Sequence, residues 1–131
     1  MPTASYEKFQ PAIELMLEGG SLGTETYALK LATERTLSAG TITETTNGGG
    51  YTTGGVAVTV STAAQSGGTY TLAITQPTNP MWTATTGFTF QYVVLVGSVS
   101  GAIASWDYGS SQSVAAGETV SVTLTTVLTV A

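Results

Sequence analysis

The sequence predicts a mainly β protein: an antiparallel β-sandwich or jelly roll that carries one short N-terminal α-helix. From Tyr27 onward, apolar residues alternate with small or polar ones, which is the pattern of strands with one buried face. Clusters of Gly, Asn and Ser interrupt this alternation about every ten residues, a spacing typical of sandwiches and barrels. A helical period occurs in one place only, before Gly19.

The predicted helix rests on apolar residues that fall on one helical stripe. These are Phe9, Ala12, Ile13, Met16 and Leu17. Pro11 suits the first helical position, and Gly19 ends the pattern. The regular helix is therefore expected over residues 11–18, with a preceding turn from Tyr6. Because an isolated helix this short is marginal in water, its stripe should pack against the sheet or a partner.

Strands are expected wherever the apolar period is two. The segments are residues 27–32, 56–60, 70–75, 88–96, 102–108 and 119–128. The segment 88–96 becomes apolar on both faces near Val93 and Leu95, which indicates the central strand of a sheet. Threonine takes the place of Lys and Glu on the exposed faces, where a β-branched hydroxyl side chain is suitable.

Turn signals separate these segments. They lie at residues 47–50, 54–55, 66–68, 76–80, 97–101, 109–113 and 116–117. No repeat and no second hydrophobic unit is visible in the pattern. The chain is therefore expected to be a single domain over residues 1–131, with an N-terminal helical segment over 1–23 and the β-sandwich over 24–131.

The distribution of charge limits the classes of function. Only Asp107 and Glu118 are charged between Thr45 and the C-terminus, whereas about a quarter of the residues of an ordinary domain are charged. Such a chain is expected to bury much of its surface or to present neutral faces to other protein, as an assembly component does. The net charge of −5, with three basic residues, argues against direct contact with nucleic acid.

Targeting and membrane signals are weak. Residues 1–9 lack the pattern of a signal peptide, and the aliphatic run at 92–96 is too short to span a bilayer. We therefore expect a soluble protein with no membrane partner that is not exported by the usual route.

No catalytic or cofactor site is expected. The chain has no His to activate a hydroxyl nucleophile and no Cys for a thiolate or a zinc site. The glycine-rich stretch 47–55 lacks the Lys and the helix of a phosphate loop. The acidic residues are scattered without the spacing of a calcium loop. The sequence therefore predicts a protein that is not an enzyme, with no cofactor and no metal.

Three aromatic or acidic features have structural interpretations. Trp82 is expected to be a core plug, and Tyr51 to anchor the glycine-rich loop. Alternation places Trp106 and Tyr108 on one face of a strand and Asp107 on the other. Asp107 precedes Gly and Ser residues, which favours a carboxylate that caps a turn over a catalytic one.

The turns and strand ends carry an ordered series of short motifs. In chain order they are Lys8-Phe9, Leu22-Gly23, Gly50-Tyr51-Thr52-Thr53-Gly54-Gly55, Ala64-Gln65-Ser66-Gly67-Gly68-Thr69-Tyr70, Trp82-Thr83-Ala84, Trp106-Asp107-Tyr108-Gly109-Ser110-Ser111 and Ala116-Gly117-Glu118. Over almost the whole chain this series resembles a family of small tailed-phage proteins described as phage structural or hypothetical proteins. The chain departs from the family pattern at residues 97–101, where Gly-Ser-Val-Ser-Gly replaces a Tyr-Asn-Asp-like turn.

The resemblance implies a virion protein made in the host cytoplasm, and no catalytic residues are carried over from it. Combined with the neutral composition, it favours a capsid decoration (cement) protein on the capsid surface that binds the major capsid protein. A homo-oligomer, either a dimer or a trimer, is expected. The candidate interface residues are Phe9, Ile13, Met16, Leu17, Tyr51, Trp82 and Trp106. The alternative is a tail or fibre module that binds a host glycan or surface protein, with Trp82, Trp106 or Tyr51 as stacking platforms.

Overall fold

The computed structural model describes residues 4–9, 25–75, 78–123 and 126–130, and all regular elements among these residues are strands. The strands are β1 (Ser5–Lys8), β2 (Tyr27–Thr36), β3 (Thr41–Glu44), β4 (Val56–Val58), β5 (Val60–Ser66), β6 (Thr69–Ile74), β7 (Trp82–Thr83), β8 (Gly87–Gly97), β9 (Gly101–Ala115), β10 (Thr119–Val120) and β11 (Thr126–Val130). Their pairings are antiparallel. The prediction of a mainly β, antiparallel protein is confirmed.

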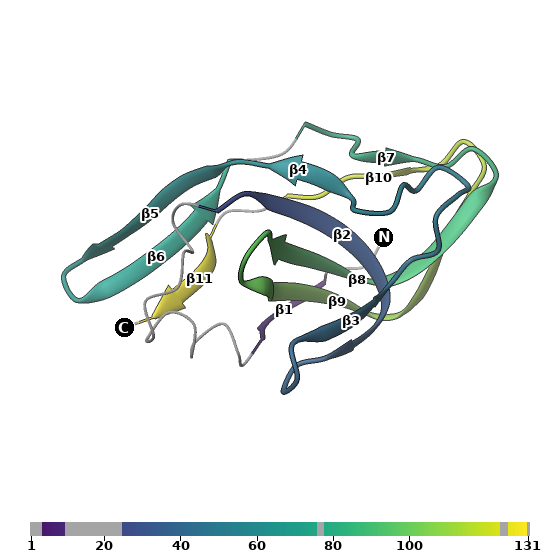
Figure 1. Ribbon diagram of the computed structural model, residues 1–131. Coiled ribbons are helices and arrows are strands. Elements are labelled where there is room, and N and C mark those ends of the chain that lie inside the picture. The colour runs from purple at the N-terminus through teal and green to yellow at the C-terminus, as the bar shows by residue number, and fades with distance from the viewer. Residues whose placement is uncertain (1–3, 10–24, 76–77, 124–125, 131) are drawn as a thin grey trace.

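The largest sheet has six strands in the order β1-β9-β8-β2-β3, with β4 also paired to β2 (Figure 1). β8 lies between β9 and β2, and its residues Val93, Val94 and Leu95 are buried. The prediction of a central strand at 88–96 is therefore confirmed. Burial on both faces requires the continuous apolar run that the sequence shows there.

β2 shares one of its edges between two partners. β4 pairs with Tyr27–Leu29, and β3 pairs with β2 from Ala32 onward. Neither strand pairs with Leu31, whose carbonyl instead accepts from the N–H of Thr45, just after β3, at 2.8 Å. The loop that joins β3 to β4 crosses this gap. The side chain of Tyr51 in this loop bonds to the backbone of β2 there.

Two smaller sheets complete the fold: the three-stranded sheet β11-β6-β5 and the pair β10-β7. β5 follows β4 after Thr59 alone, so the chain passes directly from the large sheet into the three-stranded one. Figure 1 shows the β5–β6 hairpin extending beyond the large sheet on the left. The main core takes side chains from all three sheets, including Leu29, Leu72, Trp82 and Val120.

A second, smaller cluster lies on the opposite face of the large sheet. It contains Phe9, Ala32, Val94 and Ala102. Val94 belongs to it while its neighbours on β8 belong to the main core, because successive residues of a strand point to opposite faces.

The expected turn from Tyr6 into a helix is wrong. Residues 5–8 form β1, which pairs with β9 from Ala104 to Asp107. The backbone N–H of Phe9 then donates to the carbonyl of Ile103 at 3.0 Å. A free edge of β9 offers hydrogen bonds that an isolated first turn of a helix does not, and pairing with it prevailed over the helical pattern. The helix expected at 11–18 lies outside the described residues.

The expected turn at 109–113 is also wrong. β9 continues through this segment to Ala115. The register with β8 shifts between Phe90 and Tyr92, which pair with Gln112 and Asp107. The strand accommodates the extra residues in a bulge at Gly109, which has a φ of +84°. Glycine and serine therefore mark an irregularity within one strand here.

The long strand expected over 119–128 is divided between two sheets. β10 pairs with β7, and β11 pairs with β6. The alternation of residues was recognised correctly, but it reports which face is buried and not which sheet the strand joins. The strand expected over 56–60 is likewise divided between β4 and β5, which lie in different sheets, and β5 beyond Val60 had no prediction. The short strands β3 and β7 also had none, since four residues or fewer show too little of a period.

Candidate functional site

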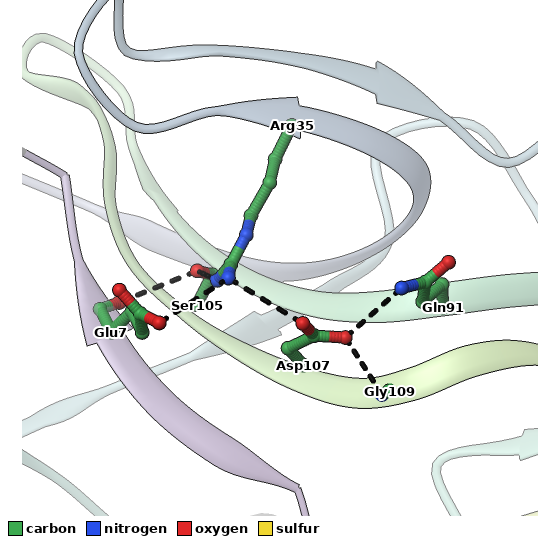
Figure 2. A network of polar contacts seen from close by, with 6 residues as sticks. All are labelled: Glu7, Arg35, Gln91, Ser105, Asp107 and Gly109. Carbon is green, nitrogen blue, oxygen red and sulfur yellow. Dashed lines mark hydrogen bonds and ion pairs between the residues drawn. The ribbon is translucent and has the colours of Figure 1, made fainter.

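The largest gathering of charge in the described residues surrounds Arg35, near the end of β2. Its guanidinium passes over the ring of Tyr92 on β8, 4.7 Å from the ring centroid. It donates a hydrogen bond to Ser105 Oγ on β9 and lies 3.6 Å from the carboxylate of Asp107. It also lies 3.7 Å from the carboxylate of Glu7 on β1. Figure 2 shows Arg35 reaching Ser105, Asp107 and Glu7 across the sheet.

Asp107 is held from several sides. Its Oδ1 accepts hydrogen bonds from the backbone N–H of Gly109 at 2.7 Å and from Gln91 Nε2 at 3.1 Å (Figure 2). Burial acts to raise the pKa of Asp107, but these hydrogen bonds and the charge of Arg35 outweigh it and hold the pKa below its ordinary value. The contact with Gly109 is a backbone hydrogen bond of the expected kind, but it lies at the bulge in β9 and not at the turn that was expected there. The pairing with Arg35 was not predicted.

The arginine cluster is suited to holding strands together. Its side chains come from β1, β2, β8 and β9, and only 9% of the Arg35 side chain is exposed. Ser105 Oγ also donates to the carbonyl of Glu7 at 3.3 Å. Asp107 therefore accepts from fixed donors, and the ion pairs of Arg35 with Asp107 and Glu7 tie β2 to β9 and β1.

A second polar cluster fills the gap along the edge of β2. The hydroxyl of Tyr51 accepts from the backbone N–H of Leu31 at 3.2 Å and donates to Glu44 Oε2 at 2.5 Å. The same carboxylate oxygen accepts from Gly54 N–H at 2.7 Å, and its partner oxygen lies 3.7 Å from Lys30 Nζ. Burial first, and the hydrogen bond to Glu44 next, raise the pKa of Tyr51 well above its ordinary value. The prediction that Tyr51 anchors this loop is confirmed.

Other acidic residues cap turns. The carboxylate of Glu25 accepts from the N–H groups of Val99 at 3.2 Å and Ser100 at 2.9 Å, and from the Ser100 hydroxyl at 2.5 Å. This ties the turn between β8 and β9 to the start of β2. Glu118 is exposed and accepts from Ala115 N–H at 2.7 Å.

Among the predicted interface residues that the structure describes, Tyr51 and Trp82 pack together, with ring centroids 6.1 Å apart, whereas Phe9 lies in the other cluster. Phe9, Tyr51 and Trp82 are 0%, 1% and 4% exposed, with Phe9 in the small cluster and the other two in the main core. The prediction of Trp82 as a core plug is confirmed. Trp106 is partly buried and its ring centroid lies 5.7 Å from that of Tyr6. Ile13, Met16 and Leu17 lie outside the described residues.

A neutral groove was missed by the sequence reasoning. It has a volume of about 510 Å³ and lies where the β2–β3 hairpin diverges from the β8–β9 hairpin. Its lining consists of Thr33, Thr45, Thr46, Asn47, Gly48, Gly49, Gly87, Phe88, Thr89, Ser113 and Val114. None of these residues is charged. Isolated hydroxyl residues on four separate segments gave no local motif, so only the strand order reveals the groove.

The walls of the groove are fixed by backbone contacts. The carbonyl of Gly49 accepts from the N–H groups of Thr85 at 2.8 Å and Gly87 at 3.2 Å. The hydroxyl of Thr45, a buried residue, donates to the carbonyl of Thr89 at 2.9 Å. A Cβ atom at Gly49 would lie 1.9 Å from the carbonyl oxygen of Gly87, and the φ of Gly49 is +67°. Glycine is therefore required for this close approach.

Comparison of the chain with family models, with curated proteins and with solved structures gives no match. Within the described ranges, acidic side chains do not gather in groups of three that could hold a metal ion. Nor do these ranges contain a helix long and apolar enough to cross a membrane.

Proposed function

We propose that this protein is a bacteriophage capsid decoration, or cement, protein that binds across neighbouring subunits of the major capsid protein and stabilises the head. The observation that carries the proposal is the way the chain uses its few charges. Glu44 holds Tyr51, and Asp107 pairs with Arg35, so these charges fix the fold instead of facing a partner. The protein acts by binding, without catalysis.

The exposed surface supports this proposal. Thr41 and Thr43 on β3 and Thr119 on β10 are exposed positions with small neutral side chains. Interface cores are depleted in charge, because a charge that loses water without gaining a partner costs free energy. The motif series that resembles small phage structural proteins adds the virion location and the major capsid protein as partner. We also propose that the sheets around the shared core pack as a β-sandwich or jelly roll.

Many weak contacts can produce a strong effect on a shell. Each copy that bridges two capsid subunits favours the closed assembly over separated subunits, and the contributions accumulate over many copies. A dimer or trimer of this chain would add to the number of bridges at each site.

The test compares phage heads with and without this protein. Heads that carry it should survive heating and osmotic shock longer and retain more DNA, and electron microscopy should show its density on the capsid surface. Equal survival, with density on the tail instead, would overturn the proposal. A heated sample of empty expanded shells serves as the control for effects of packaged DNA.

The second candidate is a tail or fibre module that recognises a host surface glycan or protein. The neutral groove between the two hairpins favours it, because such a groove offers hydroxyl groups to a polar ligand. The stacking platforms expected for this candidate do not support it. Tyr51 and Trp82 are buried in the core, and Trp106 is partly covered by Tyr6.

A further inference from the structure

We propose that the groove lined by Thr33, Thr46, Asn47, Thr89 and Ser113 is a binding site for a neutral carbohydrate. This inference does not depend on the position of the protein in a virion. A volume of about 510 Å³ lies within the range of about 300–1,000 Å³ that is typical of small-molecule sites. A second hollow, beside Glu34 and Arg35, has about 180 Å³ and a charged lining, which does not suit the same ligand.

The groove offers polar side chains on one face of the sheet. Thr89 and Ser113 are cross-strand partners on β8 and β9, and their neighbours Phe88 and Val114 belong to the core on the other face. Thr33 lies where the β2–β3 register shifts, so its side chain comes to the groove from a third strand. All three are exposed. Hydroxyls from three strands therefore converge on one space. The Thr33 hydroxyl already donates to the carbonyl of Thr43 at 3.4 Å, so it serves a ligand as an acceptor.

Hydroxyl groups suit a polyhydroxylated ligand because each can donate one hydrogen bond and accept others. Asn47 adds an amide. Its Oδ1 accepts from the N–H of Thr53 at 2.9 Å, which orients the side chain and leaves Nδ2 as the donor for a ligand. The absence of charge in the lining disfavours phosphate, sulfate and acidic sugars, which need Arg or Lys.

An extended peptide is a weaker match for the groove. A peptide that adds to a sheet needs free backbone groups along an edge. Here the carbonyls of Gly49 and Thr89 and the N–H of Gly87 are already bonded within the chain. The groove is lined by side-chain hydroxyls and an amide, together with Phe88, Val114 and glycine backbone, on a fixed frame. A frame that is already rigid loses little conformational entropy on binding.

The test begins with an array of immobilised oligosaccharides built from neutral hexoses and N-acetylhexosamines, with sialylated and sulfated sugars beside them. The full chain should bind one or more neutral sugars and none of the anionic ones. Titration of the bound sugar into isotope-labelled protein should shift the amide signals of residues 45–49, 87–89 and 113. Absence of binding to every neutral sugar, or shifts confined to another surface, overturns the proposal.

Variants separate this site from other surfaces. Thr89→Arg and Ser113→Arg should each weaken sugar binding at least tenfold, because they fill the groove from exposed positions. Thr119→Arg, at an exposed position of β10, is the matched control and should bind as the unchanged chain does. Asn47→Asp keeps the acceptor for Thr53 and removes the amide donor, so binding should weaken while the fold is retained.

Unchanged affinity in the two groove variants would refute the proposal, as would a groove that binds unstructured peptides and no sugar. Circular dichroism checks that each variant is folded. Binding of the same variants to phage heads is measured in parallel. Loss of sugar binding with intact head binding would separate this site from the capsid interface, so failure of one proposal is distinguishable from failure of the other.

Discussion

At the scale of single residues, Tyr51 shows how one hydroxyl completes a sheet. It lies beside the part of β2 where neither β3 nor β4 supplies a partner, and it takes the N–H of Leu31 as a neighbouring strand would. Its other bond holds Glu44, which in turn holds Gly54. The anchoring role of Tyr51 was predictable from its place among glycines. Its partners were not, because they depend on where β3 and β4 end.

Replacement of this hydroxyl tests the interpretation. Tyr51→Phe should lower the free energy of unfolding by about 1–3 kcal/mol, because it leaves the backbone N–H of Leu31 without a partner and removes one of the hydrogen bonds of Glu44. Chemical denaturation followed by tryptophan fluorescence measures the change. The matched control is Tyr108→Phe: among the described residues no hydrogen bond of the Tyr108 hydroxyl is seen, and its ring packs edge-on against Phe90 at 5.4 Å. Equal effects of the two substitutions would contradict the role given to Tyr51.

The lowered pKa of Asp107 predicts how the stability of the fold depends on pH. Its pKa is lowered in the folded chain, so the folded state binds its proton less readily than the unfolded state. The resulting stability is present above the ordinary pKa of about 3.9 and is lost as pH falls through the folded value. Asp107→Asn should therefore unfold about 1 kcal/mol more easily at pH 7, where the charge-assisted contacts are formed.

The difference between Asp107→Asn and the unchanged chain should shrink when pH falls below about 4, since the protonated acid then resembles the amide. Urea denaturation at a series of pH values from 7 to about 2.5 measures this change. A difference that stays constant across the series would show that the charge of Asp107 is not what holds Arg35.

At the scale of elements, β1 is the part of the fold that the sequence predicted least well. The helical spacing of Phe9 with later residues suggested a stripe. Instead Phe9 follows a strand, is fully buried and packs near Val94 and Ala102. Tyr6 on β1 is 43% exposed, although its ring contacts Trp106. Strand and helix periods overlap in such a short segment, so the available edge of β9 determines the result.

Two substitutions in this segment test whether Phe9 is part of the buried core or only lies near the sheet. Phe9→Ala should cost about 3–5 kcal/mol of unfolding free energy, the usual range for removal of a buried Phe side chain. Tyr6→Ala should cost less, about 1 kcal/mol, because the ring of Tyr6 is partly exposed where it contacts Trp106. Thermal and urea denaturation measure both. A cost for Phe9→Ala no larger than that for Tyr6→Ala would show that the N-terminal segment is not part of the core.

A local alternation of residues is sufficient to predict a strand when the strand is long and stays within one sheet. The segments 70–75 and 88–96 were recognised because each is long enough to show its period and stays within one sheet. The segment 119–128 shows a clear alternation, yet its two halves join different sheets. Strand order also places Arg35 beside Asp107, which is 72 residues away in the chain. No spacing rule in the sequence reports such a contact, and the same limit applies to the groove.

At the scale of the whole molecule, the few charges should make association with a partner nearly independent of salt. Salt weakens contacts between exposed charges and leaves neutral ones almost unchanged. Glu25, Glu44 and Asp107 are already bound to groups within the chain. The exposed positions of β3 and β10 carry threonine. A capsid interface built from these faces therefore has few ion pairs for salt to screen.

Binding of the purified chain to heads that lack it should thus change less than about threefold in dissociation constant between 0.05 and 0.5 M salt, over which the Debye length falls from about 14 to about 4 Å. Sedimentation of heads with fluorescently labelled protein measures the bound fraction. The exposed carboxylate of Glu34 allows a check, because Glu34→Lys reverses a charge without touching the core. If affinity falls tenfold or more with salt, and Glu34→Lys changes that dependence, then ion pairs carry the interface. The neutral faces would in that case be incidental to binding.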